Sequence, residues 1–238
     1  MSSGDRIKMA VSGYITHHNE VGGGWVGVGY PRSANSWVRY IVKSCRGEAE
    51  VPVHFMKDEN DYYIKRHWMQ RYPYYNNMSR GFILLLRNYK EVIVRHNKQD
   101  KTDDPDFLFY QSLVRMPDEQ SNPAVSYIHP IFLYDNWSGG PKHIVYYEDL
   151  MEKPHEIIEE LGEVMNFETK EFLENYDYHK NHSIQAYDKE EGSWTKGGEI
   201  KDAYKDDLTD EQRKAWDAHL RENFPYLFAA FLKRYADE

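Results

Sequence analysis

The sequence has one cysteine, no long apolar run and no excess of basic residues, and each absence excludes a class of protein. Cys45 cannot form an intramolecular disulfide, so we expect a small core residue in a reducing compartment. The longest strongly apolar run, Phe82–Leu86, is too short to span a bilayer, and residues 1–14 contain no signal-peptide core. These features predict a cytoplasmic protein with no membrane partner.

Charge and length limit the remaining classes. Acidic residues outnumber basic ones by 39 to 30, and the net charge of -9 disfavours a general nucleic-acid-binding surface. Any anion site must therefore be built locally. The 238 residues suffice for one sizeable α/β domain, and we predict a single domain over residues 1–238, with residues 1–24 as an irregular arm. His17 and His18 in that arm lack partners at ligand spacing, so we predict no metal site.

The stretch Trp25–Trp37, WVGVGYPRSANSW, predicts a strand, a tight loop and a helix. Its first half is a short apolar run with glycines, which is typical of a buried parallel strand that another group approaches closely. Pro31 ends this strand, and apolar residues then fall at helical spacing until Gly47. A loop of small residues at a helix N-terminus presents unpaired N–H groups and a positive dipole to one point. We therefore predict a phosphate or sulfate site, with Arg32 adding a full positive charge.

The same loop argues against one group of phosphate-binding proteins. A kinase or GTPase loop of the type GxxxxGK[ST], counted from Gly29, has Gly-Lys-Ser where this chain has Ala34-Asn35-Ser36. The lysine that reaches the β- and γ-phosphates is missing, so the loop suits another phosphate ligand better than a magnesium-bound nucleoside triphosphate. A nucleotide or nucleoside kinase on a related P-loop fold stays open as the alternative.

The segment Tyr30–Trp37, YPRSANSW, resembles the 5′-phosphosulfate loop of sulfotransferases that use 3′-phosphoadenosine 5′-phosphosulfate (PAPS). That loop is usually written YPKSGTTW or YPRSGNTW. The resemblance implies that six loop residues contact the cofactor, namely Arg32, Ser33, Ala34, Asn35, Ser36 and Trp37. Arg32 departs from the lysine common in the cytosolic branch of the family; its guanidinium can clamp oxygens but cannot give up a proton.

A second basic element lies at Lys65-Arg66-His67, at the end of a short extended segment. Taken alone, this triplet is more typical of a solvated basic turn. If the strands are parallel, however, it converges on the same anion as the loop, because open α/β sheets bind ligands at the carboxyl ends of their strands. Cytosolic sulfotransferases have a Lys-Thr-His element here, whose histidine is the general base. The resemblance thus implies catalytic roles for His67 and Lys65 together with Arg32.

The apolar run Gly81–Leu86 predicts a buried strand that leads through a turn into a helix. The following segment, Arg87–Arg95 or RNYKEVIVR, is similar to the family's 3′-phosphate motif RNPxDVxVS, in which the arginine and the serine hold the phosphate. Arg87 matches, whereas Tyr89 replaces the proline and Arg95 replaces the serine. We expect Arg95 to bind the 3′-phosphate bidentately; the alternative is a shifted helix that turns it away.

Two later segments extend the resemblance. His143–Tyr147 predicts a strand before an amphipathic helix, and in the family the tyrosine at the position of Tyr147 packs near the adenine. Lys196 and Gly197 stand where an Arg-Lys-Gly loop closes over the 3′-phosphate. The next matching segment, Thr209–Gln212, is also a capping box, which is a purely structural reason for the same residues.

These motifs, in the right order over residues 30–212, predict an α/β fold with a P-loop-like central parallel β-sheet flanked by helices. The resemblance implies in-line transfer of the sulfuryl group from PAPS to a hydroxyl or amine of a small-molecule acceptor. The nucleotide product is 3′-phosphoadenosine 5′-phosphate (PAP). Since basic residues can neutralise the phosphosulfate, no metal is required. A catalytically silent module that only binds PAP or PAPS is a further alternative. The identity of the acceptor and the choice between monomer and homodimer stay open.

Overall fold

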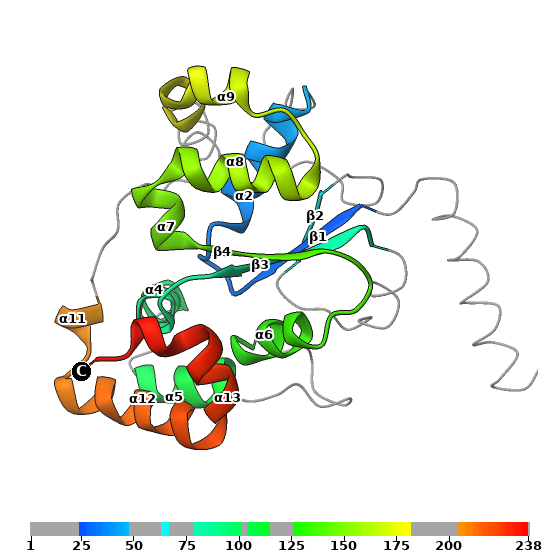
Figure 1. The fold of residues 1–238 in the computed structure, drawn as a ribbon. Coiled ribbons are helices and arrows are strands. Elements are labelled where there is room, and N and C mark those ends of the chain that lie inside the picture. The colour runs from blue at the N-terminus through cyan, green and yellow to red at the C-terminus, as the bar shows by residue number, and fades with distance from the viewer. Residues whose placement is uncertain are drawn as a thin grey trace, which may run out of the picture.

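The structure is a computed structural model that describes residues 24–47, 63–66, 79–100, 104–114, 126–181 and 204–237. Its centre is a four-stranded parallel sheet in the order β2-β1-β3-β4 (Figure 1). The strands are β1 (Trp25–Gly29), β2 (Tyr63–Arg66), β3 (Gly81–Leu86) and β4 (Lys142–Tyr146). Helices cover both faces of this sheet, so the α/β class predicted from the sequence is confirmed.

The two central strands are buried along their whole length. A strand covered on both faces has no solvent side, which explains why β1 and β3 are continuous apolar runs without alternation. Gly27 in β1 has a specific reason, because a Cβ there would lie 1.7 Å from the Tyr63 hydroxyl oxygen. The missing side chain therefore lets the fully buried Tyr63 ring cross β1 from the neighbouring strand.

Two helical layers pack on the sheet and bury different residues of β3. Ile83 and Leu85 belong to the cluster under the first layer, whereas Leu84 and Leu86 belong to the cluster under the second. The first layer consists of α2 (Asn35–Cys45), α7 (Tyr147–Glu152), α8 (Pro154–Met165) and α9 (Lys170–Glu174) (Figure 1). The second layer begins with α4 (Tyr89–Asp100), α5 (Pro105–Leu108), the π-helix η2 (Phe109–Val114) and α6 (Ile128–Asp135).

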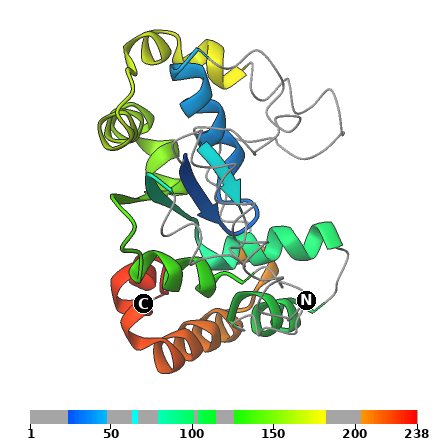
Figure 2. The same cartoon turned by 90° about the vertical axis from the view of Figure 1, so that its right-hand side faces the viewer.

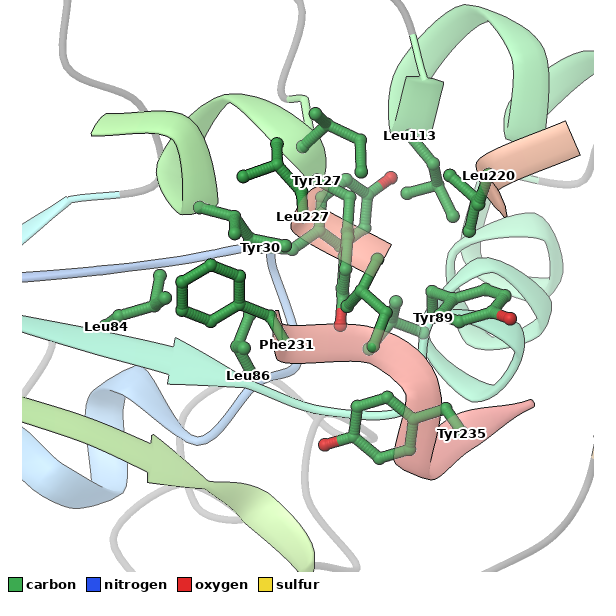
Figure 3. Packing of buried hydrophobic residues seen from close by; sticks show 14 of the residues in the cluster. Tyr30, Leu84, Leu86, Tyr89, Leu113, Tyr127, Leu220, Leu227, Phe231 and Tyr235 are labelled. Atoms are coloured by element: carbon green, nitrogen blue, oxygen red, sulfur yellow. The ribbon is translucent and has the colours of Figure 1, made fainter. Parts of the chain in front are cut away.

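The chain after residue 203 completes this second layer (Figure 2). Its elements are α11 (Tyr204–Asp207), α12 (Asp210–Asn223), α13 (Pro225–Leu227), the π-helix η3 (Phe228–Leu232) and the 3₁₀-helix η4 (Lys233–Tyr235). Figure 3 shows Leu220, Leu227 and Phe231 of these elements packed together with side chains from β3 and α4. The capping box at Thr209 and Gln212 is confirmed, since both of its reciprocal hydrogen bonds form.

A buried ion pair ties α4 to this later part of the chain. Lys90 is fully buried, and its Nζ lies 2.8 Å from Oδ1 of Asp217 and 3.3 Å from Oδ2 of Asp237. It also donates to the Tyr235 carbonyl oxygen at 2.8 Å. The Tyr89 hydroxyl donates to Asp217 as well. The first turn of α4 is thus anchored by partners that are distant in sequence.

Cys45 closes α2, and Gly47 has a φ of 69°, as expected for the residue that stops a helix. Burial raises the pKa of the Cys45 thiol to about 12, which keeps it protonated at neutral pH and supports a packing role. Among the helices that the structure describes, none combines the length and the apolar character needed to cross a bilayer.

Candidate functional site

The connections between the strands indicate that a ligand is expected at the carboxyl ends of the strands. The chain leaves β1 through α2 toward β2, and it leaves β3 through α4 toward β4 on the other side. The two central strands are therefore followed by helices on opposite faces and connections in opposite directions. Such a topological switch point, at the carboxyl ends of the strands, is where open α/β sheets bind ligands.

The loop after β1 has the backbone geometry of an anion site. The Ser33 N–H donates to the Tyr30 carbonyl oxygen at 3.1 Å, which closes a tight turn. Arg32 and Ala34 both adopt left-handed backbone conformations, with φ values of 77° and 65°, and the 11-residue helix α2 begins immediately afterwards. Turns of this kind bring successive N–H groups together, and the helix dipole adds a positive end at the same place.

Ala34 is a non-glycine residue in a conformation that favours glycine. The left-handed region costs an L-residue about 1–2 kcal/mol. Part of this cost is offset, because the unfolded chain has less conformational entropy to lose with alanine than with glycine at this position. We therefore expect Ala34→Gly to raise the free energy of unfolding by about 0.5–1 kcal/mol in a denaturant titration. Ala215→Gly, at an exposed position in α12, is the matched control and should lower it by about 1 kcal/mol. A loss of stability in both variants would contradict the strain at Ala34.

Two side chains of the loop pack against or bond to neighbouring residues, and a third has no hydrogen-bond partner among the described residues. Asn35 is buried; its Nδ2 donates to the Gly27 carbonyl at 3.4 Å, and its Oδ1 accepts from the Tyr63 hydroxyl at 3.3 Å. Trp37 stacks on Tyr40 with ring centroids 5.5 Å apart. By contrast, Ser33 is 1% exposed and its Oγ has no hydrogen-bond partner within the described part of the chain. A buried hydroxyl without a partner is costly and marks a place where a bound group can accept or donate.

Arg87 follows β3 and connects the two predicted phosphate motifs. Its Nη1 donates to the Arg32 carbonyl oxygen at 3.1 Å, across 55 residues of sequence. Its guanidinium carbon lies 3.8 Å from the centroid of the Tyr147 ring, and the residue is 4% exposed. Burial lowers the pKa of Arg87 from its ordinary value, but a guanidinium begins so far above neutrality that it keeps its charge. The structure thus places a charged group directly against the loop after β1.

Arg95 is brought to the same place by helix α4. Its Nε donates to Oε1 of Glu91 at 2.6 Å, and the same oxygen lies 3.5 Å from Nη2 of Arg87. Since both guanidinium groups contact one oxygen, Arg95 lies on the side of α4 that faces Arg87. Arg95 is 31% exposed, and in the described residues only its Nε is engaged. Its two terminal nitrogens therefore keep donors for a further anion.

The backbone of Lys65 and Arg66 reaches the same edge of the sheet. They end β2, which is parallel to β1, with Lys65 in register with Gly27 and Arg66 in register with Val28. The parallel course on which the second basic element depended is therefore confirmed. His67, Lys196 and Gly197 lie outside the described residues, and their roles stay predictions.

Tyr147 lies beside Arg87, and the strand predicted over His143–Tyr147 is shifted by one residue, since β4 spans Lys142–Tyr146. Strand β4 ends at Tyr146, and Tyr147 opens α7, a helix with acidic residues in its first turn. One of these, Glu148, accepts the Asn88 N–H at 3.0 Å and so anchors α7 to the turn after β3. This bond joins the segments that follow β3 and β4.

Glu91 is a site residue that the sequence analysis missed. It is 2% exposed and, besides both arginines, accepts the Tyr204 N–H on Oε2 at 3.2 Å. One signal was present: residues 87, 91 and 95 are four apart, which places them on one face of a helical turn. Through Tyr204, the described chain also returns to the site a few residues after Gly197.

Comparison with models of known protein families gives no match, and no curated protein matches the chain at a significant level. In the part of the chain that the structure describes, no three histidine, cysteine or carboxylate side chains are grouped to hold a metal ion. The site is therefore judged from its own residues: a tight loop at a helix N-terminus, two adjoining arginines and an aromatic ring.

Proposed function

We propose that this protein is a PAPS-dependent sulfotransferase on a P-loop-like α/β fold. It would transfer the sulfuryl group to a hydroxyl or amine of a small-molecule acceptor and release PAP. One observation supports this most strongly: Arg87 donates to the Arg32 carbonyl at 3.1 Å, so the residues that resemble the 5′-phosphosulfate loop adjoin those that resemble the 3′-phosphate motif. A nucleotide with anionic groups on both its 3′ and 5′ positions needs such a pair of neighbouring sites.

Each described element has a role in holding the cofactor. The N–H groups of Ser33 to Trp37 at the start of α2 would bind the 5′-phosphosulfate, since the helix N-terminus favours negative charge. Arg87 and Arg95 would bind the 3′-phosphate, where planar guanidinium groups match its oxygens. The Tyr147 ring would pack near the adenine, and Lys196-Gly197 would cover the 3′-phosphate.

The reaction is an in-line displacement at sulfur. A new bond forms between the acceptor oxygen or nitrogen and sulfur as the bond from sulfur to the phosphate oxygen breaks, and PAP leaves with that electron pair. His67 takes the proton of the acceptor as it attacks. Arg32 and Lys65 stabilise the charge that grows on the bridging and equatorial oxygens.

The direct test is an assay of sulfuryl transfer. Purified protein would be incubated with labelled PAPS and a panel of phenols, alcohols and amines, and both PAP and sulfated product would be measured. Equal amounts of both products, formed without added magnesium, would support the proposal. PAP binding without any product would favour the silent binding module instead. Magnesium-dependent ATP binding, with no binding of PAP, would favour the kinase alternative.

Cofactor binding gives a second test, on Arg87. We expect Arg87→Ala to weaken PAP binding by about 10- to 150-fold in calorimetric titration, because at least one charge-assisted hydrogen bond to phosphate is lost. The matched control is Arg80→Ala. Arg80 is exposed and precedes the amino end of β3, whereas the proposed site lies at the carboxyl ends of the strands. The control should bind PAP as the wild type does. Equal affinity in both variants would remove Arg87 from the site.

A further inference from the structure

Glu91 places a negative charge where the proposed function requires the binding of an anion. Its side chain is only 3% exposed, and its Oε1 lies between Nε of Arg95, at 2.6 Å, and Nη2 of Arg87, at 3.5 Å. Oε2 accepts the Tyr204 N–H at 3.2 Å. The carboxylate is therefore fully engaged and fixed between the two cations.

The charges explain why a carboxylate is needed there. Two guanidinium groups brought to one place repel each other, and the repulsion is strong where burial limits screening by water. Arg87 is 4% exposed, so its charge is shielded mainly by protein groups. Glu91 neutralises one of the two positive charges and holds both arginines together without a ligand.

The same charge must oppose a phosphate group. A phosphomonoester bound to Arg87 and Arg95 lies beside the Glu91 carboxylate, and like charges at that range repel. Only one net positive charge of the three residues then remains to attract the ligand. We propose that Glu91 is an internal counter-anion that stabilises the free protein and limits its affinity for a phosphomonoester on this arginine pair. This inference rests on the proposed function for the identity of the ligand, the 3′-phosphate.

Glu91→Gln tests the inference because it keeps the shape of the side chain and removes its charge. Without ligand, we expect the midpoint of thermal unfolding to fall by about 5 °C, since the buried Arg87 and the partly exposed Arg95 lose their shared anion. PAP, titrated calorimetrically, should bind about tenfold more tightly than to the wild type. Adenosine 5′-monophosphate, which lacks the 3′-phosphate, should change by less than about twofold. The matched control Glu163→Gln, an exposed position on α8 with the same change in net charge, should alter neither ligand.

A second pair of variants keeps the test valid if Glu91→Gln fails to fold. Arg95→Gln leaves Glu91 to neutralise Arg87 alone, so PAP affinity should fall by about tenfold or more. Adding Glu91→Gln restores the wild-type net charge and should recover most of that affinity. Weaker or unchanged PAP binding in Glu91→Gln, or no recovery in the double variant, would overturn the inference.

A separate experiment distinguishes failure of the inference about Glu91 from failure of the proposed function. If the wild type does not bind PAP, the proposed function fails, and inorganic phosphate becomes the probe of the arginine pair. The rise in the unfolding midpoint at a fixed phosphate concentration should be larger in Glu91→Gln than in the wild type, and absent when Arg95→Gln is made alone. An equal rise in Glu91→Gln and the wild type would overturn the inference independently.

Discussion

Replacing His67 by alanine is expected to slow sulfuryl transfer by about 10²- to 10⁴-fold while PAP affinity stays within about twofold. The reason is that a positioned base removes the acceptor proton during attack, but it contributes little to holding the nucleotide. The residue before His67, Arg66, ends β2 in register with Val28, one residue before the end of β1. Single-turnover rates with bound PAPS and saturating acceptor measure the chemical step, and a PAP titration measures binding.

The matched control for this experiment is His155→Ala. His155 is exposed on α8, in the helical layer that covers the first face of the sheet, and the proposed reaction does not involve it. It should transfer at the wild-type rate. If His67→Ala also transferred at the wild-type rate, another group would have to accept the proton. If both transfer and PAP binding were lost, His67 would act in binding instead.

The second large effect is a loss of stability, which we expect when Lys90 is replaced. Lys90→Met should lower the free energy of unfolding by about 3–5 kcal/mol, because Asp217 would be left as a buried charge without its cation. Asp217 is 3% exposed and lies 2.8 Å from the Lys90 Nζ, so water cannot easily replace the missing partner. Chemical denaturation with urea, monitored by tryptophan fluorescence, measures the change.

Two further variants distinguish a lost ion pair from lost packing. Lys214→Met, at an exposed position on α12, should change stability by less than about 0.5 kcal/mol. The double variant Lys90→Met with Asp217→Leu removes both charges and should be more stable than Lys90→Met alone. A double variant that is less stable than the single one would show that packing, not the uncompensated charge, accounts for the loss.

The local parts of the fold were predicted well from the sequence. Gly81–Leu86 has in the structure the same limits that its apolar pattern indicated. The strand, loop and helix after Trp25 are also confirmed. These segments are predictable because the residues that define each element, such as glycines, prolines and apolar periodicity, lie within the element itself.

The parts that were missed depend on partners far away in the sequence. Lys90 looks like a solvated residue of a helix, and only the fold shows that Asp217, 127 residues later, makes it a buried one. The Asn35 side chain likewise accepts a hydrogen bond from Tyr63 on the neighbouring strand, a pairing that the sequence of the loop does not indicate. Local pattern alone carries no information on such pairings, since they follow from which elements pack together.

The partners of Lys90 also bear on the order in which the molecule can assemble during synthesis. Residue 90 leaves the ribosome long before its acceptors in Asp217 and Tyr235, which lie 127 and 145 residues further along. Until they arrive, the ammonium group must stay hydrated, and the start of α4 cannot settle into its dry position. Nascent chains halted before residue 217 should therefore leave the first turn of α4 unanchored, even though β1 and β3 are already complete.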